Sequence, residues 1–304
     1  MPCTGGGAAL KDTFSSFHPA VNFLYFLAVI LFSMFFLHPV FLGISLVCGT
    51  AYSIRLNGRR AVRFNLLVML PTLLLFAVMN PVFNHEGATI LVYVNDNPIT
   101  AESIVYGFAA ATMFVSVMIW FSCYNAVMTS DKFMDLFGRV IPALSLVLSM
   151  VLRLVPRLKA QTRVISNAQK CIGRDVSNGN VIQKAKNGMR ILSILTTWAL
   201  ENAIETADSM KSRGYGLKGR TSFSNFRFDR RDALGMTALI ALIALVLAGA
   251  AAGENNIVYF PVLAARPVTP FSLVVYGGYA GLCLLPLLFN LWEDAKWARL
   301  QSKT

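Results

Sequence analysis

Two short segments pair a glycine with an arginine at the end of a sequence typical of a long amphipathic helix. Glycine adopts the left-handed conformation that ends a helix, and a guanidinium offers carboxylates a planar fork of donors. Ordinary helix capping explains either segment alone, because such ends are common. Their repetition within one region indicates instead a pair of pegs that dock into grooves of another protein. The first tip is Cys171, Ile172, Gly173 and Arg174, and the second tip is Ser212, Arg213 and Gly214.

A long amphipathic helix is predicted before each tip. The first follows Pro142, runs to Ile172 and should kink at Pro156. The second begins near Met189 and ends at the second tip. Apolar residues recur every three or four positions along both helices, as on the buried face of an amphipathic helix. These residues are Leu144, Val147, Leu148, Val151, Leu152, Val155 and Leu158 in the first helix, and Ile191, Ile194, Leu195 and Trp198 in the second.

Charged side chains on these helices are candidate supports for the tips. Arg153 and Arg157 lie on the first helix, beside Pro156. Glu201 and Glu205 share one face of the second helix, because they are four residues apart. They either bond arginines of the first helix or form a solvated face, and the sequence leaves both alternatives open.

The composition of the chain indicates a membrane protein. Of its 304 residues 56% are hydrophobic and 14% charged, whereas a soluble domain carries close to a quarter charged residues. The net charge is +12, and most of the 27 Lys and Arg lie in residues 129–232. Beside apolar spans, such an excess marks cytoplasmic loops and contact with the lipid bilayer rather than a nucleic-acid partner.

The fold class is all-α, with about six transmembrane helices and five to seven as the range. Residues 1–128 should hold four spans, 129–232 a cytoplasmic domain of long helices, and 233–304 two spans with a tail. Basic residues mark the cytoplasmic side, so both termini should be cytoplasmic and the location is the inner cell membrane. Ile90–Val94 should form one strand of an external hairpin. The predicted spans are residues 21–37, 40–54, 64–79, 103–128, 233–252 and 271–292.

Enzyme and carrier chemistry find little support in the sequence. Residues 214–219 fit a Gly-x-Gly-x-x-Gly pattern, but a long helix precedes them where a nucleotide site needs a buried strand. The five cysteines are scattered and the three histidines lie far apart, so no metal site is expected and interfacial hydrogen bonding is the default for the histidines. Acidic residues are nearly absent from the spans, which argues against an ion-coupled carrier. We expect no catalytic residues and no cofactor bound by this chain.

The two tips resemble the paired Ala-Arg-Gly signatures of the transmembrane T components of energy-coupling factor (ECF) transporters, the CbiQ-like family. The resemblance covers nearly the whole chain and is strongest in residues 130–231. At the first tip, Ile172 stands where the family has arginine, and Arg174 follows two residues later. The motifs that carry the resemblance are Ala168-Gln169-Lys170 with the first tip, Ser209-Met210-Lys211 with the second, Leu152-Arg153-Leu154-Val155-Pro156, His18-Pro19, Thr129-Ser130, Ile141-Pro142 and Arg220-Thr221.

The resemblance implies a non-catalytic scaffold that transmits force during import. Each tip would insert into one of two ABC-type ATPase subunits, which are either different proteins or a homodimer and which bind the ATP and Mg. The apolar helix faces would hold a small membrane S component that carries a vitamin or a transition-metal ion, and the sequence does not distinguish these substrates. The permease of a conventional ABC transporter should instead carry one short coupling helix per half. A membrane enzyme should show clustered Asp or His at the membrane face, and we find no such cluster.

Overall fold

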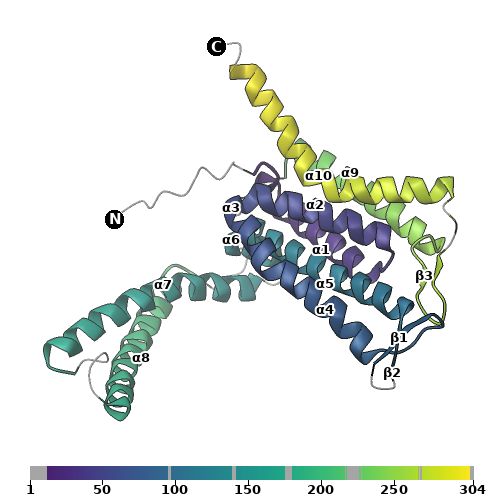
Figure 1. Ribbon diagram of the computed structural model, residues 1–304. Coiled ribbons are helices and arrows are strands. Elements are labelled where there is room, and N and C mark those ends of the chain that lie inside the picture. Colours follow the sequence, from purple (N-terminus) through teal and green to yellow (C-terminus); the bar gives the residue numbers. More distant parts are fainter. Residues whose placement is uncertain are drawn as a thin grey trace. The chain divides into compact units, whose positions relative to one another are not determined.

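The computed structural model describes residues 12–94, 97–138, 142–174, 180–215, 217, 226, 228–265, 267 and 269–301 (Figure 1). Contacts divide the chain into two compact units. We call Met1–Phe133 with Phe226–Thr304 the membrane unit, and Met134–Asn225 the inserted unit. The division falls a few residues inside the predicted region 129–232, whose cytoplasmic placement stays a prediction.

The membrane unit contains an apolar helix for each of the six predicted spans. Five are long and apolar enough to cross a membrane, whereas α1 is a shorter apolar helix of 17 residues. The third span starts earlier than predicted, since α3, η2 and α4 run on from Arg59 to Phe83. Arginines at such a helix end keep their charge in water while their stems cover apolar surface. The elements are η1 (Phe14–Ser16), α1 (Pro19–Phe35), α2 (Pro39–Asn57), α3 (Arg59–Phe64), η2 (Asn65–Met69), α4 (Leu70–Phe83), α5 (Ala101–Val127), α9 (Arg230–Ala251) and α10 (Pro270–Gln301). A further helix, α6 (Ser130–Gly138), begins in the membrane unit and ends in the inserted unit.

Histidine–proline pairs start the first two of these helices. The Nδ1 atoms of His18 and His38 accept hydrogen bonds from the backbone N–H groups of Ala20 and Val40, at 3.2 and 3.4 Å. Proline suits the first position of a helix because its missing N–H has no partner there. Hydrogen bonding, predicted for the histidines, is thus confirmed for these two, and their place at the membrane interface stays a prediction.

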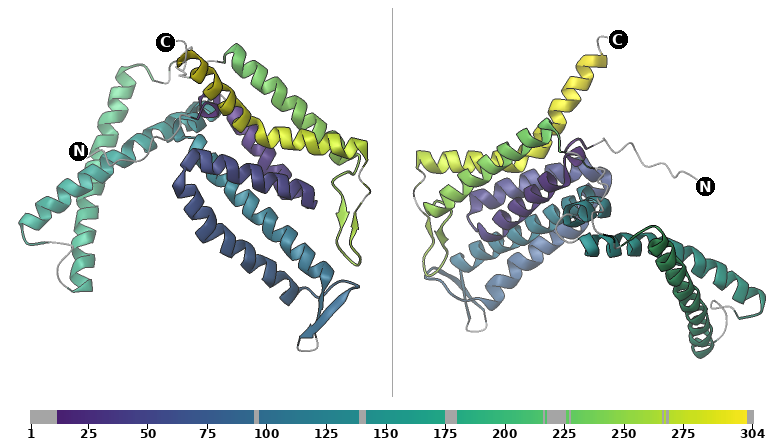
Figure 2. Two further views of the ribbon diagram at one scale, coloured as in Figure 1. Left: turned by 45° about the horizontal axis from the view of Figure 1, so that its top comes forward. Right: turned by 180° about the vertical axis from the view of Figure 1, so that it is seen from behind.

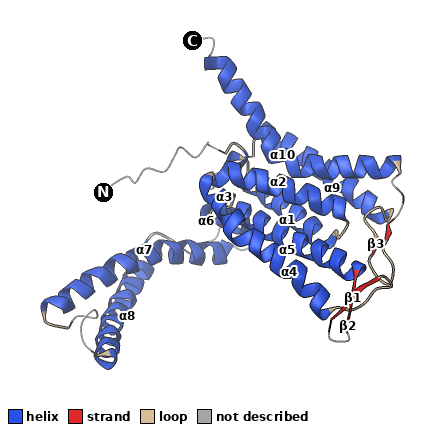
Figure 3. Cartoon of the chain, viewed as in Figure 1, coloured by secondary structure: helices blue, strands red, loops and turns tan. Residues whose placement is uncertain are grey.

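Two small antiparallel hairpins lie at one end of the membrane unit (Figure 3). β1 (Ile90–Val94) pairs with β2 (Asn97–Thr100), which confirms the predicted hairpin. β3 (Ile257–Val258) pairs with β4 (Ala264–Ala265) and was not predicted, because two-residue strands leave no alternating pattern. The two connections touch through a 3.0 Å hydrogen bond from the Ala88 N–H to the Pro261 carbonyl.

Aromatic side chains form the core of the membrane unit. Trp120 is fully buried among Tyr25, Phe26 and Tyr52, with ring centroids 6.1 to 6.5 Å apart. Its indole N–H donates to the Ser45 hydroxyl at 2.9 Å, so the buried donor is satisfied. In lipid, where helices gain little from hydrophobic association, close packing and such hydrogen bonds hold them together.

A polar network lies beside this core at the N-terminal turn. The Asp12 carboxylate accepts hydrogen bonds from the Tyr52 hydroxyl, at 3.0 Å, and from the Asn290 amide. The Asn290 side-chain oxygen in turn accepts from the Thr13 N–H at 2.8 Å. The turn therefore links α2 to α10.

The same turn forms hydrogen bonds with residues at the two points where the chain passes between the membrane unit and the inserted unit. Lys132, on α6, is buried and donates to the carbonyls of Ser15 and Val127. Burial lowers the pKa of Lys132. Asp232, in the first turn of α9, accepts from the His18 N–H at 3.2 Å and completes the capping box of its own helix. The ends of the membrane unit from which the inserted unit departs are thus fixed on one turn.

Candidate functional site

The inserted unit contains two long helices that pack against each other. α7 (Pro142–Cys171) and α8 (Val181–Ser212) cross, as Figure 2 shows, and Ile165 and Ile191 are buried. Pro156 lies inside α7, and Figures 1 and 2 show α7 changing direction along its length, as expected for a helix with an internal proline. The arrangement gives each tip a helix of its own.

The start of α8 corrects the prediction. The helix begins at Val181 rather than near Met189. The Asn180 side-chain oxygen accepts from the Val181 N–H at 2.8 Å and caps the helix. Gly188 lies within the helix at a cost of about 1 kcal/mol, which the cap and the strong helix formers around it offset.

The first tip ends α7 in a Schellman motif. Gly173 has a φ of +75°, in the left-handed region. Its N–H donates to the Lys170 carbonyl at 3.0 Å, and the Arg174 N–H donates to the Gln169 carbonyl at 2.9 Å. These two bonds satisfy carbonyls at the helix end that otherwise lack intrahelical partners.

The second tip ends α8 in the same motif. Gly214 has a φ of +74°, its N–H donates to the Lys211 carbonyl at 3.0 Å, and the Tyr215 N–H donates to the Met210 carbonyl at 3.1 Å. The two glycines fix a common register for the tips. Ile172 thus occupies the position of Arg213, and Arg174 occupies that of Tyr215.

The cap alone does not mark a docking site. α9 ends in the same pattern at Gly253, with a φ of +81°, where the Glu254 N–H donates to the Gly249 carbonyl at 3.1 Å. The tips differ from it in what they expose. Arg213 and Arg174 are exposed cations, and 60% of the Ile172 side chain is accessible, an unusual place for an apolar residue at a helix end.

A polar groove of about 430 Å³ separates the facing halves of α7 and α8. Arg157 crosses between the helices, because its Nη1 donates to the Asn202 side-chain oxygen at 2.8 Å and its Cζ lies 5.4 Å from the Trp198 ring centroid. Arg213 thus lines a groove that the helix crossing itself shapes. The lining residues are Leu146, Ser149, Met150, Arg153, Arg157, Asn202, Glu205, Thr206, Ser209, Met210, Arg213 and Tyr215.

The acidic supports are placed differently from the arginines. Glu205 lines the groove and Glu201 does not, and both residues are exposed. Within the described ranges the ion pair is Arg55–Asp294, and neither glutamate takes part in one. The structure thus favours the solvated alternative for these glutamates. Trp198 and Asn202 of α8 face α7 and contact Arg157. Both are uncharged, so a search of the sequence for oppositely charged pairs did not select them.

The other candidate motifs contribute nothing further to this site. Gly216 and Gly219 of the glycine pattern, together with Ile141, Arg220 and Thr221, lie outside the described residues. No group of three or more His, Cys, Asp or Glu side chains that could hold a metal occurs in the part of the chain that the structure describes.

Comparison with known proteins identifies the family. The model of CbiQ, described as cobalt transport protein, matches residues 13–223, which include both tips. The chain belongs to the CbiQ family. Among its relatives is the energy-coupling factor transporter transmembrane protein EcfT of Streptococcus thermophilus, 30% identical over 181 residues, 56% of this chain and 69% of the relative.

Two further relatives carry the same name. The protein of Staphylococcus aureus is 26% identical over 185 residues, 57% of this chain and 69% of that one. The protein of Lactobacillus helveticus is 36% identical over 117 residues, 38% of this chain and 42% of that one. The resemblance drawn from the sequence is thus confirmed. This CbiQ-family chain is a T component of the energy-coupling factor class, a multi-pass membrane transport subunit.

Proposed function

We propose that the inserted unit couples two ABC-type ATPases to a small, substrate-binding S component in the membrane. The first and second tips each dock in a groove of one ATPase. ATP and Mg bind to the ATPases, whose motion passes through α7 and α8 to the S component. The chain itself holds no cofactor, and its cargo is a vitamin or a transition-metal ion. The inserted unit and both termini lie on the cytoplasmic side of the inner cell membrane.

The observation that carries this proposal is the common end of the two crossing helices. Both finish in the same cap, in the same register, with side chains exposed beyond the last turn. A helix transmits a displacement of its end along its length, because its backbone hydrogen bonds resist stretching and compression. Two such helices in contact move together when either end is displaced.

The sides of the helices supply the second surface that coupling needs. Apolar side chains are exposed along both helices, at about half or more of their accessible area. A solvated helix pair rarely leaves such a surface uncovered, so we assign it to the S component. The residues are Val147, Val151 and Val155 on α7, and Leu200 and Ile204 on α8.

The two tips should bind their ATPases by different forces. Arg213 offers a forked cation to a carboxylate, whereas Ile172 at the equivalent position offers only apolar contact. Arg174 follows the cap residue Gly173, whereas Arg213 precedes the cap residue Gly214, so the charge of the first tip lies at a different position in the motif. We therefore expect the second tip to depend on salt and the first to depend on shape.

Copurification from the native membrane tests the proposal. The chain carries a C-terminal tag, is extracted gently, and its partners are quantified by mass spectrometry. Arg213→Glu should lower ATPase recovery at least tenfold, because it places like charge in an acidic groove. The matched control is Arg190→Glu, the same charge change at an exposed position of the same helix. It should leave recovery within twofold.

The partners recovered with the unmodified chain decide between functions. ABC-type ATPases together with a small, very hydrophobic protein agree with the proposal, and the small protein reveals the substrate class. ATPases without such a protein would favour a conventional permease. Recovery of no ATPase from an intact preparation would contradict coupling and reopen the membrane-enzyme alternative.

A further inference from the structure

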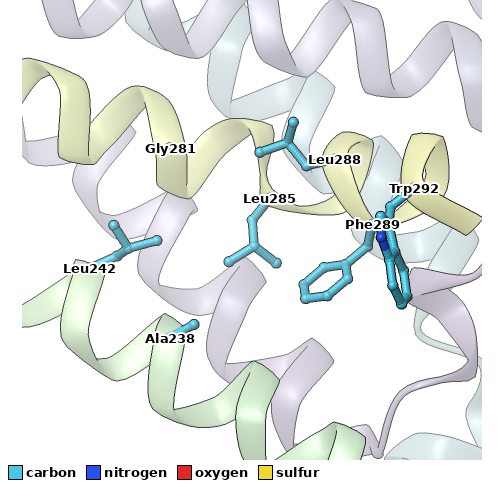
Figure 4. Close-up of a pocket in the computed structure, with 7 residues that line it drawn as sticks. All are labelled: Ala238, Leu242, Gly281, Leu285, Leu288, Phe289 and Trp292. Carbon is cyan, nitrogen blue, oxygen red and sulfur yellow. The ribbon is translucent and has the colours of Figure 1, made fainter.

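An apolar hollow of about 450 Å³ lies between α9 and α10 of the membrane unit. In Figure 4, Leu285 and Phe289 point into the space between the two helices, and the ring of Trp292 lies next to Phe289 at one end. Gly281 lines it at a point where an added Cβ would make an ordinary contact, 3.8 Å from the nearest Leu242 carbon. The lining residues are Ala238, Leu242, Gly281, Leu285, Leu288, Phe289 and Trp292.

The size of the hollow limits its occupant. A helix with side chains is about 10–12 Å wide and rises about 5.4 Å per turn, so one turn fills roughly 500 Å³. The hollow is thus comparable in size with a single helical turn, so it suits a narrow, flexible occupant better than a whole helix. A volume of this order is typical of small-ligand sites. One flexible hydrocarbon chain fits it.

Two cations flank the hollow: Lys296 lies over an aromatic ring of its lining, and Arg231 is separated from the lining by one further ring. The Lys296 Nζ lies 5.6 Å from the ring centroid of Trp292. On the other side, the Phe289 ring lies 5.1 Å from that of Phe17, and the Arg231 Cζ lies 4.7 Å from the Phe17 centroid. Both cations are exposed. Cations beside aromatic rings at the edge of a span are typical of the headgroup level of a membrane.

Acidic residues near these cations are already partly engaged. Asp294 pairs with Arg55 across to α2. Asp232 is buried and accepts from backbone N–H groups. Two further carboxylates, Asp229 and Glu293, lie near the same end of the two helices. The exposed Arg230 adds a third cation to the two that flank the hollow. Among the groups here that are neither buried nor paired with Arg55, three cations (Arg230, Arg231 and Lys296) thus face two carboxylates (Asp229 and Glu293), which suits an anionic headgroup.

We propose that the hollow binds an anionic phospholipid of the surrounding membrane. One acyl chain lies between α9 and α10, against Leu242, Leu285 and Phe289. The phosphate lies between Lys296 and Arg231, and Trp292 packs against the lipid near its glycerol. This site is separate from ATPase docking, so the failure of either proposal leaves the other intact.

Quenching of tryptophan fluorescence by brominated phospholipids tests the site. The full chain, with Trp198→Phe and Trp297→Phe, is placed in phosphatidylcholine nanodiscs, which leaves Trp292 and the buried Trp120 as fluorophores. Brominated phosphatidylglycerol or brominated phosphatidylcholine is then added in increasing mole fraction. A cation near the membrane surface favours anionic lipid about fivefold. We expect phosphatidylglycerol to reach half-maximal quenching at a mole fraction at least fivefold lower.

Two variants and one control locate the effect. Lys296→Gln should reduce the preference for phosphatidylglycerol about fivefold, whereas Arg60→Gln, which removes an exposed cation at the end of another span, should leave it unchanged. Gly281→Leu fills the hollow and should reduce quenching by both lipids. Equal quenching of the starting protein by the two lipids would overturn the proposal, and it is the result expected if the hollow served a partner instead. A preference that survives Lys296→Gln but falls with Arg60→Gln would also overturn it.

Discussion

The membrane unit and the inserted unit are built on opposite principles. In the membrane unit, aromatic side chains such as Trp120, Tyr25 and Phe26 are completely buried, and the Trp120 indole and the Tyr25 hydroxyl donate hydrogen bonds to neighbouring helices. Among the described residues of the inserted unit, the buried apolar side chains are Ile165 and Ile191. The first unit is held by its own packing, and the second leaves most of its apolar surface exposed.

In our proposal, this difference follows from what each unit has to do. The membrane unit anchors the chain in the bilayer, so its helices need a fixed packing, which closely packed aromatic rings and buried hydrogen bonds provide. A lever that contacts several proteins needs exposed surface and shallow internal packing, so that its helices adjust when partners move. The partners, in our proposal, complete the core of the inserted unit.

The largest expected effect is the loss of a core ring. Trp120→Ala should lower the free energy of unfolding by about 3–5 kcal/mol, because it leaves a cavity and removes the donor to Ser45. Ile191→Ala, the deletion of a smaller buried side chain in the inserted unit, should cost about 2 kcal/mol, the low end of the range for isoleucine. Equilibrium unfolding in detergent measures both. Equal costs would contradict the contrast between the units.

Lys132 should give the membrane unit a distinctive dependence on pH. Burial lowers the pKa of Lys132 in the folded protein. The unfolded chain, with a lysine pKa of about 10.4, therefore binds this proton more tightly. The free energy of unfolding should rise as pH increases from the folded pKa toward about 10.4, and then level off.

Removing the ammonium should flatten this rise. Lys132→Met should also cost about 1–3 kcal/mol near neutral pH, because the carbonyls of Ser15 and Val127 lose their donor. Unfolding measured at several pH values provides the readout. The same rise in the variant would show that another group titrates.

A smaller loss of stability is expected when a contact between α7 and α8 is removed. Arg157→Ala removes the hydrogen bond to Asn202 and the contact with the Trp198 ring, which together contribute about 1–2 kcal/mol. Amide hydrogen exchange should accelerate along α8 while the spans remain protected. Acceleration in α5 instead would mean that the two units do not open separately.

The smallest effect is expected at the solvated acids. Glu201→Gln should change the free energy of unfolding by less than about 0.5 kcal/mol, since the side chain is exposed. ATPase recovery should also stay within twofold. A larger loss in either measurement would indicate a partner for Glu201 and would revive the interhelical ion pair.

Much of this protein was predictable because its signals are local. Runs of apolar residues determine spans in a solvent without water, and a glycine in the left-handed region ends a helix wherever it lies. The six apolar helices, the β1–β2 hairpin and the ends of α7 and α8 therefore followed from sequence. The start of α8 did not follow from sequence. The cap at Asn180 stabilises the first turns of the helix and Gly188 destabilises them, and the two free energies are similar in size.

Only the tertiary structure decided which distant residues meet. Arg157 finds Asn202 and Trp198 rather than an acid, since the crossing of two helices selects which face of each is shared. The turn near Asp12 likewise contacts α2, α6, α9 and α10. No periodic pattern in the sequence predicts these contacts, because the residues that make them lie far apart in the chain. Local sequence determines where each helix lies in the chain. Long-range packing determines which of its side chains find a partner and which remain available to other molecules.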